Sequence, residues 1–128
     1  MPQDPERRPT VYGFYLVPGF ALMAFTSVLE PLRAANVISG RTLYGWRLLT
    51  RDGEPAVPSS GLRMMADEAI AAHQRLDRIV VCTGGAAHRF DDAGTFAWLR
   101  RQARSGAAMC APLRPRWWNM PRALPIKA

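Results

Sequence analysis

Short apolar runs alternate with longer amphipathic stretches along most of the chain. The runs at residues 11–17 and 78–82 are rich in aromatic or β-branched residues, and they predict strands buried on both faces. Alternating positions predict a further strand at 43–50. Apolar residues at spacings of three and four predict helices at 20–38 and 92–105. Strands that alternate with helices are typical of an α/β fold around a mostly parallel sheet.

Glycines and aspartates set the limits of the predicted helices. Gly40 falls in the position that ends the first helix. The Asp91-Asp92 pair opens the helix at 92–105, and Gly106 ends it, so residues 107–110 are expected to begin another strand.

The stretch between the second and third of these strands is less regular. Residues 55–66 predict short extended pieces that follow the Asp52-Gly53 turn. Asp67 and Glu68 would favour the amino end of a helix, so we expect a helix at about 67–75.

Composition limits the class of protein. The chain has 128 residues, of which 48% are hydrophobic, and this suits one domain with its own core. No apolar run approaches the roughly 20 residues of a membrane helix, and the polar start lacks the apolar segment of a secretory signal. Two cysteines do not make a disulfide framework in a chain of this length. We therefore expect a cytoplasmic protein that does not associate with membranes.

The positive charge is concentrated near the carboxyl end. Residues 1–92 carry 10 basic and 10 acidic side chains, whereas residues 93–128 carry 7 basic side chains and no acid. Such a block can contact nucleic acid. However, Arg100, Arg101 and Arg104 fall on the predicted helix and its last turns, where cations favour the helix dipole. We therefore expect no direct DNA binding by this chain alone.

Three sequence strings carry a family resemblance. They are VPGFALMAFTSVLEPLRAAN at 17–36, YGWRLLTRDGEPAVPSSGL at 44–62, and VVCTGG at 80–85. From about Val11 to Ser105 the chain resembles the amino-terminal half of the ThiJ/PfpI-like (class I glutamine amidotransferase-like) domain. The version it resembles is fused to GlxA-type AraC-family regulators. The resemblance implies an incomplete doubly wound sheet, flavodoxin-like and mostly parallel, with helices on both faces.

The resemblance also assigns candidate site residues. Glu30 matches a helix-one acid that reaches a nucleophilic cysteine, and Gly84 and Gly85 match a turn whose backbone N–H groups lie near it. Cys110 is the one candidate for that cysteine, but Pro112 stands where the sharp turn needs a small residue. We therefore expect Cys110 to be a strand-end cysteine without catalytic function.

Each candidate also has a purely structural interpretation. Glu30 is either a buried ligand-site carboxyl with a raised pKa or a residue that braces a kink at Pro31. Arg33 and Asn36 could hold a ligand or a neighbouring subunit, or simply form a solvated helix face. Gly84-Gly85 alone is weak as a motif.

The sequence predicts neither a metal site nor a cofactor. His73 and His88 lack the spacing of metal ligands and are expected at the surface, and Cys82 is expected in the core. No Gly-rich phosphate loop is present.

Three segments are expected along the chain. Residues 1–10 would form a disordered leader, 11–110 a partial ThiJ/PfpI-like domain, and 111–128 an irregular basic tail outside the family fold. The tail has four prolines and no regular period. Its abrupt departure from the family pattern suggests a truncation or a frameshifted reading frame.

The favoured function is a non-catalytic domain for ligand sensing and dimerisation in an AraC-type transcriptional regulator, without the helix-turn-helix. The resemblance suggests a small amine- or amino-acid-derived metabolite as ligand, and exposed strand edges suggest a homodimer. One alternative is a ThiJ/PfpI-type cysteine-dependent hydrolase, hydratase or glyoxalase. Another is a nucleic-acid-binding fragment that uses the basic tail.

Overall fold

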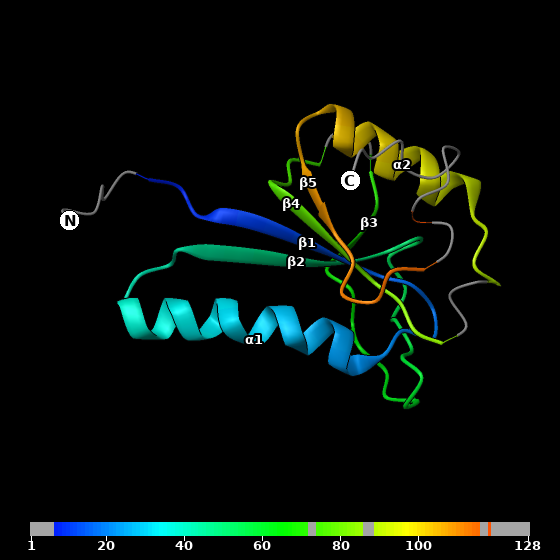
Figure 1. Cartoon of the computed structure of the whole chain (residues 1–128), viewed down its shortest axis with the longest axis horizontal. Coiled ribbons are helices and arrows are strands. Elements are labelled where there is room, and N and C mark those ends of the chain that lie inside the picture. Colours follow the sequence, from blue (N-terminus) through cyan, green and yellow to red (C-terminus); the bar gives the residue numbers. More distant parts are fainter. Residues whose placement is uncertain (1–6, 72–73, 86–88, 116–117, 119–128) are drawn as a thin grey trace.

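The computed structural model describes residues 7–71, 74–85, 89–115 and 118. Five strands form one sheet in the order β3-β2-β1-β4-β5, and every neighbouring pair is parallel. The two helices, α1 (Leu22–Ser39) and α2 (Ala93–Arg104), cover opposite faces of this sheet (Figure 1). The strands are β1 (Thr10–Leu16), β2 (Tyr44–Thr50), β3 (Glu68–Ala69), β4 (Arg78–Cys82) and β5 (Ala108–Cys110). The predicted α/β fold, a parallel sheet with helices on both faces, is confirmed.

The central strand β1 is buried on both faces, and its side chains alternate between two core layers. Phe14 and Leu16 belong to the layer beneath α1, together with Phe25 of that helix. Tyr15 and Val17 belong to the layer beneath α2. The ring of Phe14 meets that of Phe25 edge to face at 5.1 Å. A strand covered by a helix on each side explains why the run at 11–17 is almost continuously apolar.

The helix ends follow from local backbone chemistry. Gly40 ends α1 with a left-handed φ of 69°, and its N–H donates to the carbonyl of Val37. The Asp92 carboxylate accepts the Thr95 N–H at 3.0 Å and so caps the amino end of α2. α1 continues through Pro31 as one helix, and the kink predicted there stays a prediction.

The prediction of a helix at 67–75 is wrong. Glu68–Ala69 form the edge strand β3, which pairs with Leu49 and Thr50 of β2. Asp67 does not cap a helix, because its carboxylate accepts the Leu48 N–H at 2.6 Å. The open edge of β2 provides backbone hydrogen-bond partners for this segment. Pairing with β2 stabilises the segment more than a short isolated helix would, because the helical preference of its acidic residues is weak. The extended pieces expected at 55–66 are present as an antiparallel bridge between Ala56 and Met64.

Contacts at both ends of the domain reach beyond the expected limits of residues 11 and 110. Thr10 already belongs to β1, and both terminal nitrogens of Arg8 donate to the Asp77 carboxylate, at 2.8 and 3.0 Å. After β5, the Leu113 carbonyl accepts the Thr83 hydroxyl at 2.7 Å, and Trp118 is buried in the layer beneath α2. The remainder of the expected leader and tail, residues 1–6, 116–117 and 119–128, lies outside the described residues.

The outer surface of α1 carries exposed apolar side chains. Met23, Val37 and Ile38 are 79%, 68% and 85% exposed, respectively. Across the described ranges, neither helix has the length and apolar character needed to cross a membrane.

Candidate functional site

The strand order places one switch point in the sheet, between β1 and β4. The chain runs outward from β1 to β2 and β3, and then returns to the other side of β1 to form β4 and β5. Ligands of open α/β sheets bind outside the carboxyl ends of the strands at such a point. In this chain the position is bounded by the turn 17–21 after β1 and by residues 83–85 after β4. The predicted pair Gly84-Gly85 therefore lies at the switch point.

The turn after β1 is held in place from two sides. The Ala21 N–H donates to the Thr83 carbonyl at 3.0 Å, which ties the start of α1 to the end of β4. On the other side, the Gly19 N–H donates to the Val57 carbonyl at 2.9 Å, and the Ser59 N–H donates to the Phe20 carbonyl at 2.8 Å. The candidate site is therefore built on a rigid backbone support.

The two glycines after β4 differ in their surroundings. A Cβ on Gly84 would clash with the carbonyl oxygen of Gly19 and would lie 3.1 Å from the Ala21 nitrogen. A Cβ on Gly85 would meet no atom of the described residues within 4 Å. Gly84 is thus required for close packing of two loops, and Gly85 faces open space at the candidate site. A role for either in ligand binding stays a prediction.

Glu30 is exposed, so the interpretation of this residue as a buried carboxyl is wrong. Its carboxylate pairs with Arg33, one turn further along α1, at 2.7 Å, and both side chains are more than half exposed. Glu30 also lies eight residues from the start of the helix, about 12 Å at the usual rise. The structure therefore does not bring Glu30 and Arg33 to the Gly84-Gly85 turn.

Asn36 is a connecting residue between α1 and β2. Its amide oxygen accepts the N–H groups of Leu43 and Tyr44 at 2.9 and 3.0 Å, and its amide nitrogen donates to the Tyr44 carbonyl at 2.9 Å. The side chain is neither a solvated face nor free for a ligand, because both ends of its amide are used. Residue type and position alone do not reveal this role.

Asn36→Ala is expected to lower the free energy of unfolding by about 2 kcal/mol, because the Tyr44 N–H and carbonyl lose their side-chain partner and the Leu43 N–H keeps only the Arg41 carbonyl, at 3.1 Å. Asn36→Asp keeps the acceptor and loses the donor, so its effect should be intermediate. Urea denaturation measures both, with Arg33→Ala as the control for an exposed position on the same helix. Equal stability of Asn36→Ala and Arg33→Ala would contradict this role.

The two cysteines lie on neighbouring strands and differ in exposure. Cys82 is fully buried in the layer beneath α1, as expected, and burial, together with the nearby Cys110, raises the pKa of its thiol to about 12. Cys110 is exposed at the end of the edge strand β5. Residues 111–115, which follow it, are not helical. The described residues thus lack the strand-to-helix turn that activates a nucleophilic cysteine in the resembled family.

A polar network that the sequence did not reveal connects the carboxyl side of the sheet to α2. The buried Tyr15 hydroxyl and the Thr95 hydroxyl share a hydrogen bond of 2.6 Å. The Asp92 carboxylate accepts the Thr95 hydroxyl at 2.6 Å and the Arg51 Nε–H at 2.7 Å. Hydrogen bonds from Thr95 and Arg51 hold the pKa of Asp92 below its ordinary value. The one signal in the sequence was the Asp91-Asp92 pair before α2, since Tyr15 comes from β1 and Arg51 directly follows β2.

Alkaline pH is expected to destabilise the fold through Tyr15. Burial, the largest cause, raises the pKa of its phenol from 10.0 to about 12. A pKa that is higher in the folded chain gives stability that is complete below pH 10 and is lost as the pH rises towards 12. The buried Cys82 thiol also titrates in this range. The Tyr15 contribution, taken as the difference between the parent chain and Tyr15→Phe in urea denaturation, should therefore amount to about 2 kcal/mol. Tyr15→Phe should lose less stability over the same range than the half-buried control Tyr12→Phe, and equal losses would contradict this assignment.

A metal site finds no support in the part of the chain that is described, where no group of three or more His, Cys, Asp or Glu side chains is placed to hold an ion. His73 and His88 lie outside the described residues.

Comparison with curated proteins finds transcriptional regulators. The chain is 35% identical over 112 residues to the HTH-type transcriptional regulator GbdR of Pseudomonas aeruginosa, an alignment that covers 88% of this chain. It is 35% identical to CdhR of the same species over 77% of its length, and 38% identical to GlxA of Rhizobium meliloti over 73%. The chain spans only 30%, 29% and 29% of these relatives, respectively. No family model matches the chain.

Comparison with solved structures finds another transcriptional regulator and two proteins with a similar fold. An AraC family transcriptional regulator from Pseudomonas putida superposes with a TM-score of 0.71 at 25% identity, over 80% of this chain and 55% of that one. A DJ-1 superfamily protein from Salmonella typhimurium gives a TM-score of 0.66 at 19% identity, over 80% and 54%. A ThiJ/PfpI family protein from Pseudomonas syringae gives 0.59 at 17% identity, over 87% and 48%. The latter two likenesses concern the fold alone.

Proposed function

We propose that this chain, which belongs to the ThiJ/PfpI-like domains of AraC-type transcriptional regulators and spans part of one, serves to sense a small ligand without chemical conversion. The observation that carries this proposal is the alignment to GbdR, which extends over 88% of the chain. The fold alone would not support it, because function resides in the site and not in the architecture.

The surroundings of Cys110 support a role without catalysis. A cysteine nucleophile needs an electropositive setting, such as a helix amino end, and nearby donors for the developing charge. Cys110 ends an edge strand, and the following Ala111–Pro115 segment forms no helix. This geometry favours the sensor over the cysteine-dependent enzyme.

The switch point is the place proposed for the ligand. Gly85 presents open space there, and the hydrogen-bonded turn 17–21 gives the site a fixed wall. The family resemblance points to an amine- or amino-acid-derived metabolite. We also infer a homodimer, since β5 lies at the edge of the sheet and an open strand edge favours association. Analytical ultracentrifugation tests the dimer, and a single monomeric species would exclude it.

The ligand proposal is tested by calorimetric titration of the chain with a panel of amines and amino acids. We expect saturable binding of at least one compound. The bound compound should be recovered without chemical change. Gly85→Leu should abolish this binding, because the new side chain would fill the open space without a clash. Gly45→Leu is the matched control, since a Cβ there also meets no atom within 4 Å and β2 begins at the opposite end of the sheet.

Two outcomes would contradict the proposal. Binding that survives in Gly85→Leu would place the ligand elsewhere. Turnover of a bound compound that disappears in Cys110→Ser would favour the hydrolase, hydratase or glyoxalase alternative.

A further inference from the structure

A pocket of about 500 Å³, largely open to solvent and called the cavity below, lies at the end of the sheet opposite to the proposed ligand site. Its walls come from the segment before β1 and from the first residues of β4 and β5, three neighbouring strands. The volume is in the range of pockets that hold small metabolites. The lining residues are Arg7, Arg8, Pro9, Thr10, Asp77, Arg78, Gly106 and Ala108.

The charged lining of this cavity is positive. Three arginines face one aspartate, which leaves a formal charge of +2. The Arg8 guanidinium is already paired, because its two terminal nitrogens donate to the two oxygens of Asp77. Asp77 is further fixed by the Val11 N–H at 2.8 Å. Among the ion pairs of the described residues, none involves Arg7 or Arg78.

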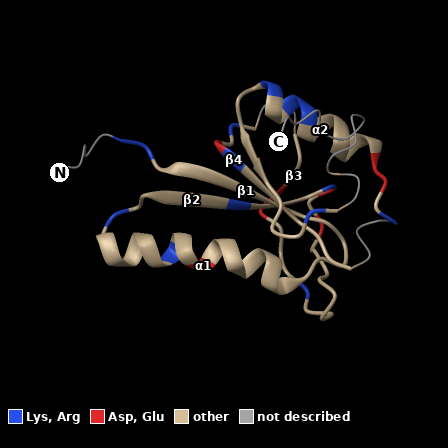
Figure 2. Ribbon diagram, viewed as in Figure 1, with Lys and Arg blue, Asp and Glu red and all other residues tan. Residues whose placement is uncertain are grey.

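The surroundings of the cavity reinforce its positive potential. Both helices run antiparallel to the strands, so Arg41 after α1 and Arg104 at the end of α2 lie towards this end of the sheet. Figure 2 shows arginines before β1, after α1 and on α2, together with one acidic segment at the start of β4; further acidic residues lie at the other end of α2. Such a field raises the local concentration of anions.

We propose that this cavity binds a small organic dianion, a phosphomonoester or a dicarboxylate, between the guanidinium groups of Arg7 and Arg78. The planar guanidinium fork matches both kinds of oxyanion and binds each through paired hydrogen bonds. The Arg8–Asp77 pair forms a fixed wall and leaves the formal charge that a dianion neutralises. This site is separate from the ligand site at the switch point, so either proposal can fail without the other.

Calorimetric titration with glycerol phosphate and, separately, with succinate at constant ionic strength tests the proposal. We expect saturable binding of one or both, and the pattern identifies the preferred oxyanion. Arg78→Gln should weaken binding by about tenfold or more, since a hydrogen bond to a charged group is lost. Arg63→Gln, an exposed arginine outside the cavity, should leave the affinity unchanged. Asp77→Asn should tighten binding, because it removes the negative charge and releases Arg8.

The proposal would be overturned if Arg78→Gln bound both probes as tightly as the parent chain. It would also be overturned if sodium chloride at the same ionic strength displaced the probes as effectively as an added dianion. Binding of a short DNA duplex that depends on Arg78, with no binding of either small probe, would instead identify the surface as a nucleic-acid contact.

Discussion

Gly84→Ala is expected to lower the free energy of unfolding by about 3 kcal/mol, at the upper end of the cost of overpacking. The added methyl group would meet backbone atoms of the turn after β1, including the Gly19 carbonyl oxygen and the Phe20 carbonyl carbon at 3.3 Å. A flexible side chain could rotate away, but this turn is fixed by hydrogen bonds to Thr83 and Val57. The strain would therefore separate the carboxyl ends of β1 and β4. Urea denaturation of the variant measures the loss.

Gly85→Ala is the control for this prediction. Its Cβ would enter open space, so the stability should change by less than about 0.5 kcal/mol, as at most surface positions. The two substitutions add the same atom to adjacent residues and differ only in what that atom meets. Equal stability of the two variants would show that the loops can separate at no cost, and would remove the structural requirement for glycine at this position.

The central part of the fold could be predicted from sequence because its signals are local and strong. The run at 78–82 is too short and too β-branched for a helix, and it forms β4 with the predicted bounds. Gly40 and Asp92 mark helix ends through backbone chemistry that does not depend on the rest of the chain. The order of the strands was not predicted, since periodicity alone does not specify which strands are neighbours.

The edge strand β3 shows where local signals fail. Asp67 and Glu68 are common at helix starts, and nothing in their own neighbourhood excludes a helix. The Asp67 side chain instead binds the backbone of β2, nineteen residues away in sequence. A contact over this distance depends on the assembled sheet, so it could not be found from propensity.

The sequence placed the Gly84-Gly85 turn after β4 but did not predict the surroundings of the other candidate residues. Gly84-Gly85 lies at the switch point, whereas Glu30 faces solvent and Asn36 binds backbone. The resemblance transferred a residue type to α1 without its orientation, which depends on the helix rotation. The Tyr15–Thr95 hydrogen bond joins residues 80 positions apart, and no sequence motif indicates it.

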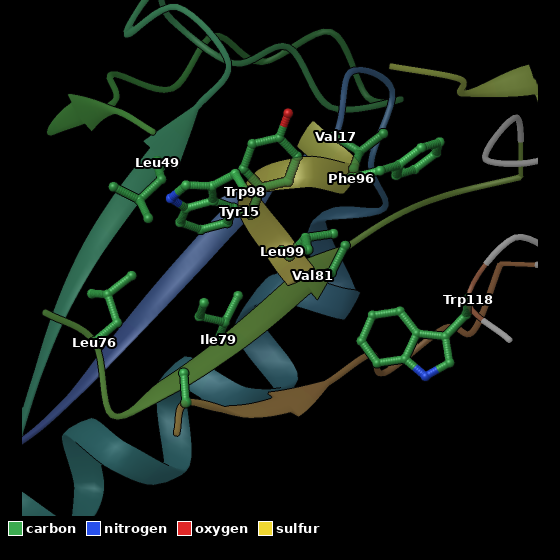
Figure 3. Close-up of a cluster of buried hydrophobic side chains, with 11 residues drawn as sticks. Tyr15, Val17, Leu49, Leu76, Ile79, Val81, Phe96, Trp98, Leu99 and Trp118 are labelled. Atoms are coloured by element: carbon green, nitrogen blue, oxygen red, sulfur yellow. The ribbon is translucent and has the colours of Figure 1, made fainter. Parts of the chain in front are cut away.

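Trp118→Ala is expected to lower the free energy of unfolding by about 4 kcal/mol, the cost of removing a buried aromatic side chain. Trp118 is 4% exposed and belongs to the layer beneath α2, together with Ile79, Val81 and Leu99 (Figure 3). Sequence alone assigned it to an irregular tail outside the fold. If the segment after β5 is part of the core, its removal must destabilise α2 as well, because both cover the same face of the sheet.

Thermal and urea denaturation of the full chain measure this loss, with Leu113→Ala as the control in the same segment. Leu113 is 49% exposed, and its backbone carbonyl still accepts the Thr83 hydroxyl after the substitution, so the effect should stay near 1 kcal/mol or below. If Trp118→Ala were as stable as Leu113→Ala, the segment after β5 would not contribute to the core. A large loss that is specific to Trp118→Ala would show that the segment after β5 covers part of the apolar face of the sheet. A sheet is stable only if its apolar face is shielded from water.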